Sequence, residues 1–359
     1  MVSSRILENP PKAESFDLLD KKILYYVNKN CRFSSSSIAK ALNTSREVVS
    51  FRIKRLIDRG VIVSFFPFMD MTRFGFDLYS VNLKFRNFTP EKEKFVNDFL
   101  VNNGGVSWVF RSAGNWDYLL LFFCKDLFQF HDFMYELKTS FSGFLKELDF
   151  QIILYEYLYS SFCKGFLEGA KVKEISPKKL DSSFEKILKN QRIEISPDRK
   201  VFDVDLLDLQ IVEELSKDAR KSFHEVSLAV KIPPETVRYR VLQLIKKEII
   251  GGFWANLSFS KLGFNWHRVL VETKGIDKKA DKKLKIFFKN HPFMIWSARA
   301  LGKYDIIFDV NSKSDGHFSL ILSDFFNEFK DILVDYESIQ VLKEVKYTNF
   351  TKNYYSILE

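Results

Sequence analysis

The sequence predicts an α+β chain of two tandem units, each a winged helix-turn-helix followed by a βαββαβ, ferredoxin-like domain. The first observation behind this prediction is a repeat, since residues 16–20 (FDLLD) return as residues 204–208 (VDLLD), 188 positions later. The second observation is a change of period, because apolar residues recur at helical spacing early in each unit and alternate as in strands later.

The repeat keeps one register over a unit of about 140 residues, a common domain size. Further pairs at the same separation are Arg32 with Arg220, Ser34 with Ser222, Glu47 with Glu235, Arg52 with Arg240, Gly75 with Gly263, Trp108 with Trp296, Gly114 with Gly302, and Asp117 with Asp305. A constant separation over such a length indicates duplication of a whole unit.

Three helices open each unit. Leu19, Ile23 and Val27 recur at helical spacing in the first helix, and Ser34 or Ser35, and Ser222 in the second unit, can cap the next helix. The third helices are centred on residues 45–59, after the Asn43-Thr44-Ser45 turn, and 233–247, where proline suits the first helical turn. The strand-forming stretches 61–66 and 249–254 then predict a wing.

The rest of each unit predicts a second domain. In the first unit the expected order is strand 78–85, helix 90–100, strands 106–112 and 118–123 around Gly114-Asn115, helix 128–141 and strand 145–155. This βαββαβ order is typical of a ferredoxin-like sandwich, and the second unit repeats it to about residue 346.

The chain is therefore divided into seven segments. These are a tail (1–15), winged helix 1 (16–66), sensor domain 1 (67–160), a basic linker with a short helix near 184–189 (161–203), winged helix 2 (204–254), sensor domain 2 (255–348) and a C-terminal tail (349–359).

Composition narrows the classes of partner that the chain could bind. A net charge of +9 and a pI near 9.1 make a polyanion such as nucleic acid, or an acidic membrane surface, a plausible partner. The cysteines at 31, 124 and 163 form no C-x-x-C pair, which fits a reducing cytoplasm. No signal peptide, membrane span, phosphate loop, nucleophile elbow or paired His/Cys spacing is found in the sequence, so no catalytic residue, cofactor or metal site is predicted.

The third helices carry the residues expected to contact duplex DNA. Each combines an apolar stripe with arginines and one outward aromatic residue, which suits insertion into the major groove. The candidate DNA-binding residues are Thr44, Ser45, Arg46, Ser50, Phe51, Arg52, Lys54, Arg55, Pro234, Glu235, Arg238, Tyr239, Arg240 and Gln243. Among them, Arg52 and Arg240 are expected to contact phosphates. The alternative is a solvated basic surface.

With these motifs the sequence resembles the Lrp/AsnC (feast/famine) transcription regulators. The resemblance rests on LDxxIL at 19–24, LDxxIV at 207–212, TVRYRV at 236–241, and the Gly-x-x-Asp turns at 114–117 and 302–305. It implies a regulator-of-amino-acid-metabolism (RAM) sensor domain after each winged helix, sensor domains that pair through their sheets, and a possible amino-acid effector near Gly114, Asp117, Gly302 and Asp305. The alternative is that the glycines shape the hairpins while the aspartates bond nearby amides.

A tandem chain departs from the usual single-unit family member. Because the linker of roughly forty residues can reach across a domain, the two sensor domains are expected to pair within one chain as a pseudo-dimer, with a homo-oligomer as the alternative. The third helices of the two units, which differ in sequence, would then bind an imperfectly palindromic DNA site.

Two other functions remain open at this point. Siroheme decarboxylases are similar in having duplicated units of this kind, but stretches 106–111 and 294–299 here contain no histidine. The histidines, at 131, 224, 267, 291 and 317, are scattered. The other function is an architectural or metabolite-sensing protein that binds DNA without sequence preference.

Overall fold

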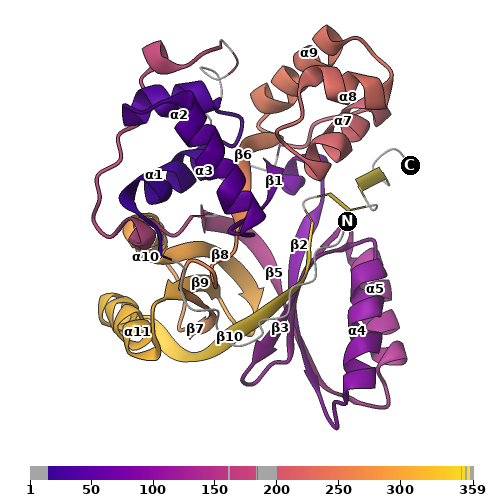
Figure 1. The fold of residues 1–359 in the computed structure, drawn as a ribbon. Helices are drawn as coiled ribbons and strands as arrows, with labels where there is room; N and C mark the ends of the chain where they lie inside the picture. The colour runs from indigo at the N-terminus through magenta and orange to yellow at the C-terminus, as the bar shows by residue number, and fades with distance from the viewer. Residues whose placement is uncertain are drawn as a thin grey trace.

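The fold is that of a computed structural model that describes residues 15–160, 162–182, 184, 200–348, 350, 351, 354 and 355. Two three-helix bundles lie side by side above a barrel of strands, and four further helices cover the outside of the barrel (Figure 1). The predicted α+β class and duplicated architecture are confirmed.

Each bundle is the helix-turn-helix part of one unit. The first comprises α1 (Leu18–Lys29), α2 (Ser35–Leu42) and α3 (Arg46–Asp58), and the second α7 (Leu206–Lys217), α8 (Phe223–Val230) and α9 (Pro234–Lys246). The predicted caps are present, because Ser34 and Ser45 accept hydrogen bonds from amides in the first turns of α2 and α3, and Ser222 does so for α8. Asn43 and Lys231 end α2 and α8 with left-handed backbone (φ 53° and 56°), which turns the chain toward the third helix.

The strand after each third helix does not form a wing within its own unit. β1 (Ile62–Met69) pairs antiparallel with β6 (Ile250–Leu257), and this pair is a separate two-stranded sheet between the bundles. The two strands also extend past the predicted boundaries at 66 and 254. The expected wing is therefore replaced, among the described residues, by a strand exchanged between units, because each strand finds its partner edge in the other copy.

The sensor domains have the predicted βαββαβ order. The first contains β2 (Asp77–Phe85), α4 (Pro90–Asn102), β3 (Val106–Ala113), β4 (Tyr118–Cys124), α5 (Leu127–Ser140) and β5 (Leu145–Tyr159). The second contains β7 (Asn265–Thr273), α10 (Lys278–Asn290), β8 (Met294–Gly302), β9 (Ile306–Ser312), α11 (Asp315–Phe329) and β10 (Leu333–Tyr347). Short 3-10 turns are η1 (Met71–Phe74), η2 (Lys164–Leu167) and η3 (Pro177–Lys179).

The two sheets close into one barrel. Their strand orders, β3-β4-β2-β5 and β8-β9-β7-β10, are the same, and their edges join through the β5–β8 and β10–β3 pairs. β5 extends to Tyr159, beyond the expected end at 155, because its second half pairs with β8. The intramolecular pseudo-dimer expected from the sequence is thus present as a continuous hydrogen-bonded sheet.

The described part of the linker packs on the first bundle. Tyr26 donates a hydrogen bond to the Lys173 carbonyl (2.6 Å), and Asp181 binds Lys40 (2.6 Å). The helix expected at 184–189 lies, apart from its first residue, outside the described residues. The three cysteines are buried and form no disulfide with one another, and burial raises the pKa of each thiol to about 12.

Two features typical of other functions are absent from the described residues. Neither a helix that combines the length and apolar character needed to cross a membrane nor a group of three or more potential metal-ligating His, Cys, Asp or Glu side chains is found among them.

A buried ion pair lies in the part of the barrel interior that the second unit forms. Arg268 and Asp309 are 0% and 1% exposed, and two parallel hydrogen bonds of 2.7 and 2.8 Å join them. The guanidinium also lies 5.0 Å from the Trp296 ring. The equivalent positions in the first unit are Ser80 and Leu121, so the charge pair belongs to one half of the pseudo-dimer.

Replacing Asp309 alone with leucine is expected to destabilise the protein by about 3–5 kcal/mol, because Arg268 is left as an unpaired buried charge. The double variant Arg268→Leu/Asp309→Leu should recover most of this stability, since neither charge is then buried. Urea unfolding of both variants checks this, and a double variant no more stable than Asp309→Leu would contradict it.

Candidate functional site

The outward faces of α3 and α9 are exposed to solvent. Phe51 and Tyr239, which occupy equivalent positions, are 65% and 62% exposed. Val49, Ile53 and Leu56 of α3 are buried against the other helices of the bundle. An exposed aromatic ring at the same place in both helices indicates a surface suited to contact with a partner.

The predicted DNA-binding residues divide by exposure. The exposed ones are Ser45, Arg46, Ser50, Phe51, Lys54, Glu235, Arg238 and Tyr239, and the partly buried ones are Thr44, Arg52, Arg55, Pro234, Arg240 and Gln243. The exposed set lies mainly on the first two turns of each helix, the part that reaches base edges when such a helix enters the major groove.

Two of the arginines expected to contact phosphates are held inside their own bundles. Arg52 lies 2.6 Å from Asp17 and 2.8 Å from Asp20, both at the start of α1. Arg240 repeats this arrangement at 2.6 Å from Asp205 and 3.0 Å from Asp208. These ion pairs join the third helix to the first and so help to position α3 and α9, while contact of Arg52 and Arg240 with phosphates stays a prediction.

The first bundle has an additional ion pair. Arg55 donates to both carboxylate oxygens of Asp20 at 2.7 Å, whereas the equivalent position in α9 is Gln243. The side chain of Asp20 is 3% exposed and serves two guanidinium groups, while that of Asp208 is 13% exposed and serves Arg240. Asp20 therefore contributes more to the stability of the first bundle than Asp208 contributes to that of the second.

The Gly-x-x-Asp turns lie at the two seams of the barrel. Asp117 accepts a hydrogen bond from the Phe85 amide (2.8 Å), and Asp305 accepts from the Thr273 amide (2.9 Å). Gly302 has a φ of 149°, and a Cβ there would stand 2.9 Å from the Phe150 carbonyl across the β5–β8 seam. This geometry matches the hairpin role that was the alternative to effector binding.

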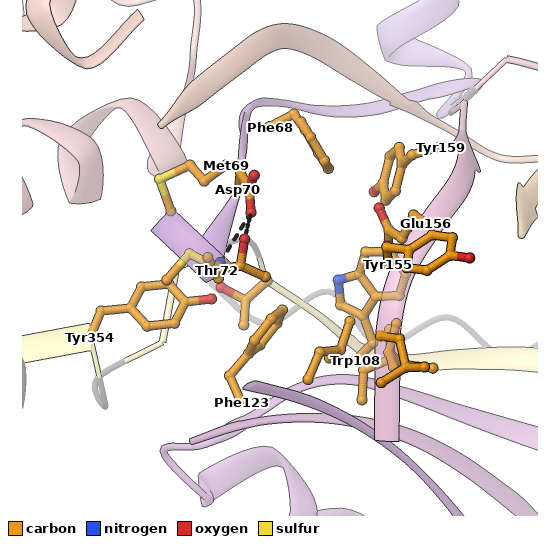
Figure 2. A pocket seen from close by; sticks show the side chains of 16 residues that line it. Phe68, Met69, Asp70, Thr72, Trp108, Phe123, Tyr155, Glu156, Tyr159 and Tyr354 are labelled. Atoms are coloured by element: carbon orange, nitrogen blue, oxygen red, sulfur yellow. Dashed lines mark hydrogen bonds between the residues drawn. The ribbon is translucent and has the colours of Figure 1, made fainter. Parts of the chain in front are cut away.

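A pocket that the sequence did not suggest lies between β1 and the barrel, and Figure 2 shows the side chains that line it. One wall carries Asp70, at the end of β1, and another carries Glu156 of β5. Trp296 donates a 2.6 Å hydrogen bond to Oε1 of Glu156, whereas Oε2 is buried without a hydrogen-bond partner among the described residues. Burial, with a smaller contribution from Asp70, raises the pKa of Glu156 to about 8.

β-bulges explain why strand alternation did not reveal Glu156. Residues four apart share one face of a regular strand, yet Ile153 faces the barrel interior while Tyr157 packs under α10. Register shifts in the β5–β8 pair fall between Ile153 and Tyr155 and between Glu156 and Leu158. These bulges reset the alternation and aim the Glu156 carboxyl group at the pocket.

Replacing Asp20 with asparagine is expected to loosen the first bundle by about 2 kcal/mol, because two guanidinium groups then lack a charged, buried acceptor. Asp208→Asn is the matched control and should cost about half as much, since one arginine depends on that carboxylate. Hydrogen exchange of peptides from α1–α3 and α7–α9 measures both effects, and equal destabilisation of the two bundles would contradict the assignment.

The stability of the protein should respond to the ionisation of Glu156. Its pKa is higher in the folded than in the unfolded chain, so its favourable contribution is complete below about pH 4.5 and falls as the pH rises to about 8. Glu156→Gln should therefore gain stability relative to the native chain over that window, with a slope of at most about 1.4 kcal/mol per pH unit. Urea unfolding between pH 5 and 8.5 checks this, with the exposed Glu147→Gln as control; parallel profiles would contradict it.

Comparison with known proteins supports both winged helices. Residues 16–63 match the family described as winged helix-turn-helix DNA-binding, and residues 204–245 match the AsnC-type helix-turn-helix domain. The chain is 44% identical over 61 residues to the HTH-type transcriptional regulator Ptr1 of Methanocaldococcus jannaschii, a match that spans 17% of this chain and 41% of Ptr1. It is 30% identical over 112 residues to the HTH-type transcriptional regulator LrpC of Bacillus subtilis, covering 31% of this chain and 76% of LrpC.

The whole duplicated fold also has a counterpart among solved structures. The siroheme decarboxylase NirDL superposes with a TM-score of 0.57 over 95% of this chain and 98% of that chain, at 12% sequence identity. At this identity the likeness concerns the fold alone. With two winged helices that match family descriptions and a relative aligned over most of its length, the chain belongs to the Lrp/AsnC family of transcriptional regulators, in a form that carries the family unit twice.

Proposed function

We propose that this protein is a sequence-specific transcription regulator that binds duplex DNA through the outward faces of α3 and α9. The observation that carries the proposal is the recurrence of an exposed third-helix face, with cations and one aromatic ring, in both units. Arg46, Lys54 and Arg238 are the exposed cations suited to phosphates or guanine edges. Phe51 and Tyr239 are placed to contact base methyl groups or sugars.

The two faces differ in chemistry, so they are expected to read different half-sites. At equivalent positions, Ser50 of α3 is replaced by Arg238 in α9, and Lys54 by Leu242. The β1–β6 pair and the closed barrel hold both bundles in one molecule. We therefore propose an imperfect palindrome as the target, and footprinting that finds a strictly symmetric site read by one kind of helix would count against it.

The Gly-x-x-Asp turns favour a role in closing the barrel over the binding of an amino-acid effector. Asp117 and Asp305 accept hydrogen bonds from β2 and β7 amides, and Gly114 and Gly302 lie against the neighbouring strands at the barrel seams. These interactions already engage the two aspartates in the hairpin geometry, so the proposed regulator does not depend on an effector at these turns.

A decarboxylase is the second candidate function, because the fold likeness to NirDL extends over nearly the whole chain. The pocket beside Glu156 is lined by two acidic residues and by no Lys, Arg or His, which suits a polycarboxylate tetrapyrrole poorly. Titration with an iron porphyrin distinguishes the two functions, since a saturable absorbance change at one equivalent would favour the enzyme.

Replacing Arg46 and Lys54 together with alanine should weaken DNA binding. The slope of log affinity against log salt concentration should also decrease by about 0.9 for each phosphate that the variant no longer neutralises. Arg238→Ala should act in the same way through α9. Binding measured by fluorescence anisotropy at several salt concentrations checks this, with Lys282→Ala, an exposed substitution on α10 remote from both third helices, as the control. Unchanged affinity and slope in the α3 and α9 variants would exclude these residues from the DNA interface.

A further inference from the structure

The pocket beside Glu156 occupies a position at which the two units have diverged. Leu78, Leu121 and Phe123 line it in the first unit. The equivalent residues of the second unit are Trp266, Asp309 and Asn311.

In the second unit these positions are filled. Trp266 packs edge-on against Phe110, with ring centroids 4.8 Å apart, and Asp309 is bound to Arg268. The corresponding interior of the second unit is thus occupied by a large ring and an ion pair, whereas the first unit keeps a cavity of about 50 Å³, enough for the polar end of a small molecule.

The two acidic side chains are the strongest acceptors of the pocket, whose lining hydroxyl and indole groups can also donate hydrogen bonds. Oε2 of Glu156 is buried and lacks a hydrogen-bond partner among the described residues, and a buried acceptor without a donor costs stability. Asp70 on the opposite wall accepts from the Thr72 amide (3.0 Å) and hydroxyl (2.6 Å). The lining includes two acids and no basic side chain, and Arg73, whose Nε lies 3.5 Å from Asp70, stands outside the lining. An anion beside Glu156 would therefore meet repulsion with no basic side chain in the lining to offset it.

The apolar lining combines aliphatic side chains with aromatic rings, and the rings gather beside Glu156. Tyr159 packs against Phe68 at 4.6 Å between ring centroids and against Trp108 at 5.8 Å, and all three rings line the pocket next to Glu156 (Figure 2). Faces of such rings attract cations, above all where water is excluded. A carboxyl group surrounded by aromatic rings is the arrangement that suits an ammonium ion on an apolar body.

We propose that this pocket binds a small organic cation, an alkylammonium or arylammonium group, whose N–H donates to Oε2 of Glu156 while its apolar part lies against Trp108 and Tyr159. The binding would satisfy the unpartnered carboxylate oxygen and place a positive charge among ring faces. This inference does not depend on DNA binding, because every group that it uses belongs to β1, the η1 turn that follows it, the barrel and the segment after β10.

The test is a titration of the full-length protein with n-butylammonium, followed through the indole N–H resonances of Trp108 and Trp296 in spectra of protein labelled with ¹⁵N-tryptophan. Butyrate, of the same length and opposite charge, is the matched probe. At about pH 8.5, we expect saturable shifts with butylammonium and at least about tenfold weaker binding of butyrate. Equal binding of the two probes, or the lack of a saturable shift with butylammonium, would overturn the proposal.

Variants locate the site. Glu156→Gln keeps the shape of the side chain and should weaken butylammonium binding at least about tenfold, whereas Glu344→Gln, at the equivalent position of the second unit, should leave it unchanged. Leu78→Trp introduces the residue found at Trp266 and should abolish binding by filling the pocket. If Leu78→Trp fails to fold, Glu156→Gln still tests the proposal, since undiminished binding of butylammonium by Glu156→Gln would refute the role of this carboxylate.

Discussion

The pairing of strand edges between the two units is the constraint on which the rest of the structure depends. Each four-stranded sheet has two edge strands, β3 with β5 and β8 with β10, and an exposed edge presents unpaired amides and carbonyls. The β5–β8 and β10–β3 pairs satisfy all four edges within one chain. The β1–β6 pair covers one edge of each strand that follows a third helix. Neither unit is therefore complete without the other.

This pairing also sets where the two third helices, α3 and α9, lie. Because β1 and β6 are exchanged between the bundles, hydrogen bonds pass from each bundle to the opposite unit. Asn28 of α1 donates to the Ala255 carbonyl of β6, and the Ala219 amide of the second bundle donates to the Phe65 carbonyl of β1. Arg52 and Arg240 then tie each third helix to the first helix of its bundle. A duplex that contacts both helices would meet two surfaces whose separation the fold has already fixed, which reduces the ordering cost of binding.

Local structure was predictable from the sequence, and most interactions between distant segments were not. The helices, their serine caps and the βαββαβ order follow from patterns within about fifteen residues, and the repeat identified the duplication. Pairing of β1 with β6 uses backbone groups, which leave no mark in residue type. The partners of Arg52 and Arg240 were within reach, because Asp17 and Asp205 precede them by the same interval in both units, although a cationic helix by itself does not reveal its counter-ion. Glu156 was hidden because bulges break the alternation that assigns strand residues to a face.

Duplication within one chain gives this protein a freedom that a symmetric dimer lacks. In a homodimer every substitution appears twice, so a change that suits one half must be tolerated in the other. Here Ser80 and Leu121 of one unit correspond to the Arg268–Asp309 ion pair of the other, and Leu78 corresponds to Trp266. The same freedom extends to the third helices, where Arg55 contributes an ion pair that Gln243 does not repeat.

The hydrogen bonds between backbone groups of the two units hold both halves in the same arrangement, because these bonds depend little on the identity of the side chains. The side chains can then diverge, one half retaining a pocket and the other filling it, while the barrel that holds both stays intact. The differences between the units in the barrel interior and on the third helices thus have one structural cause.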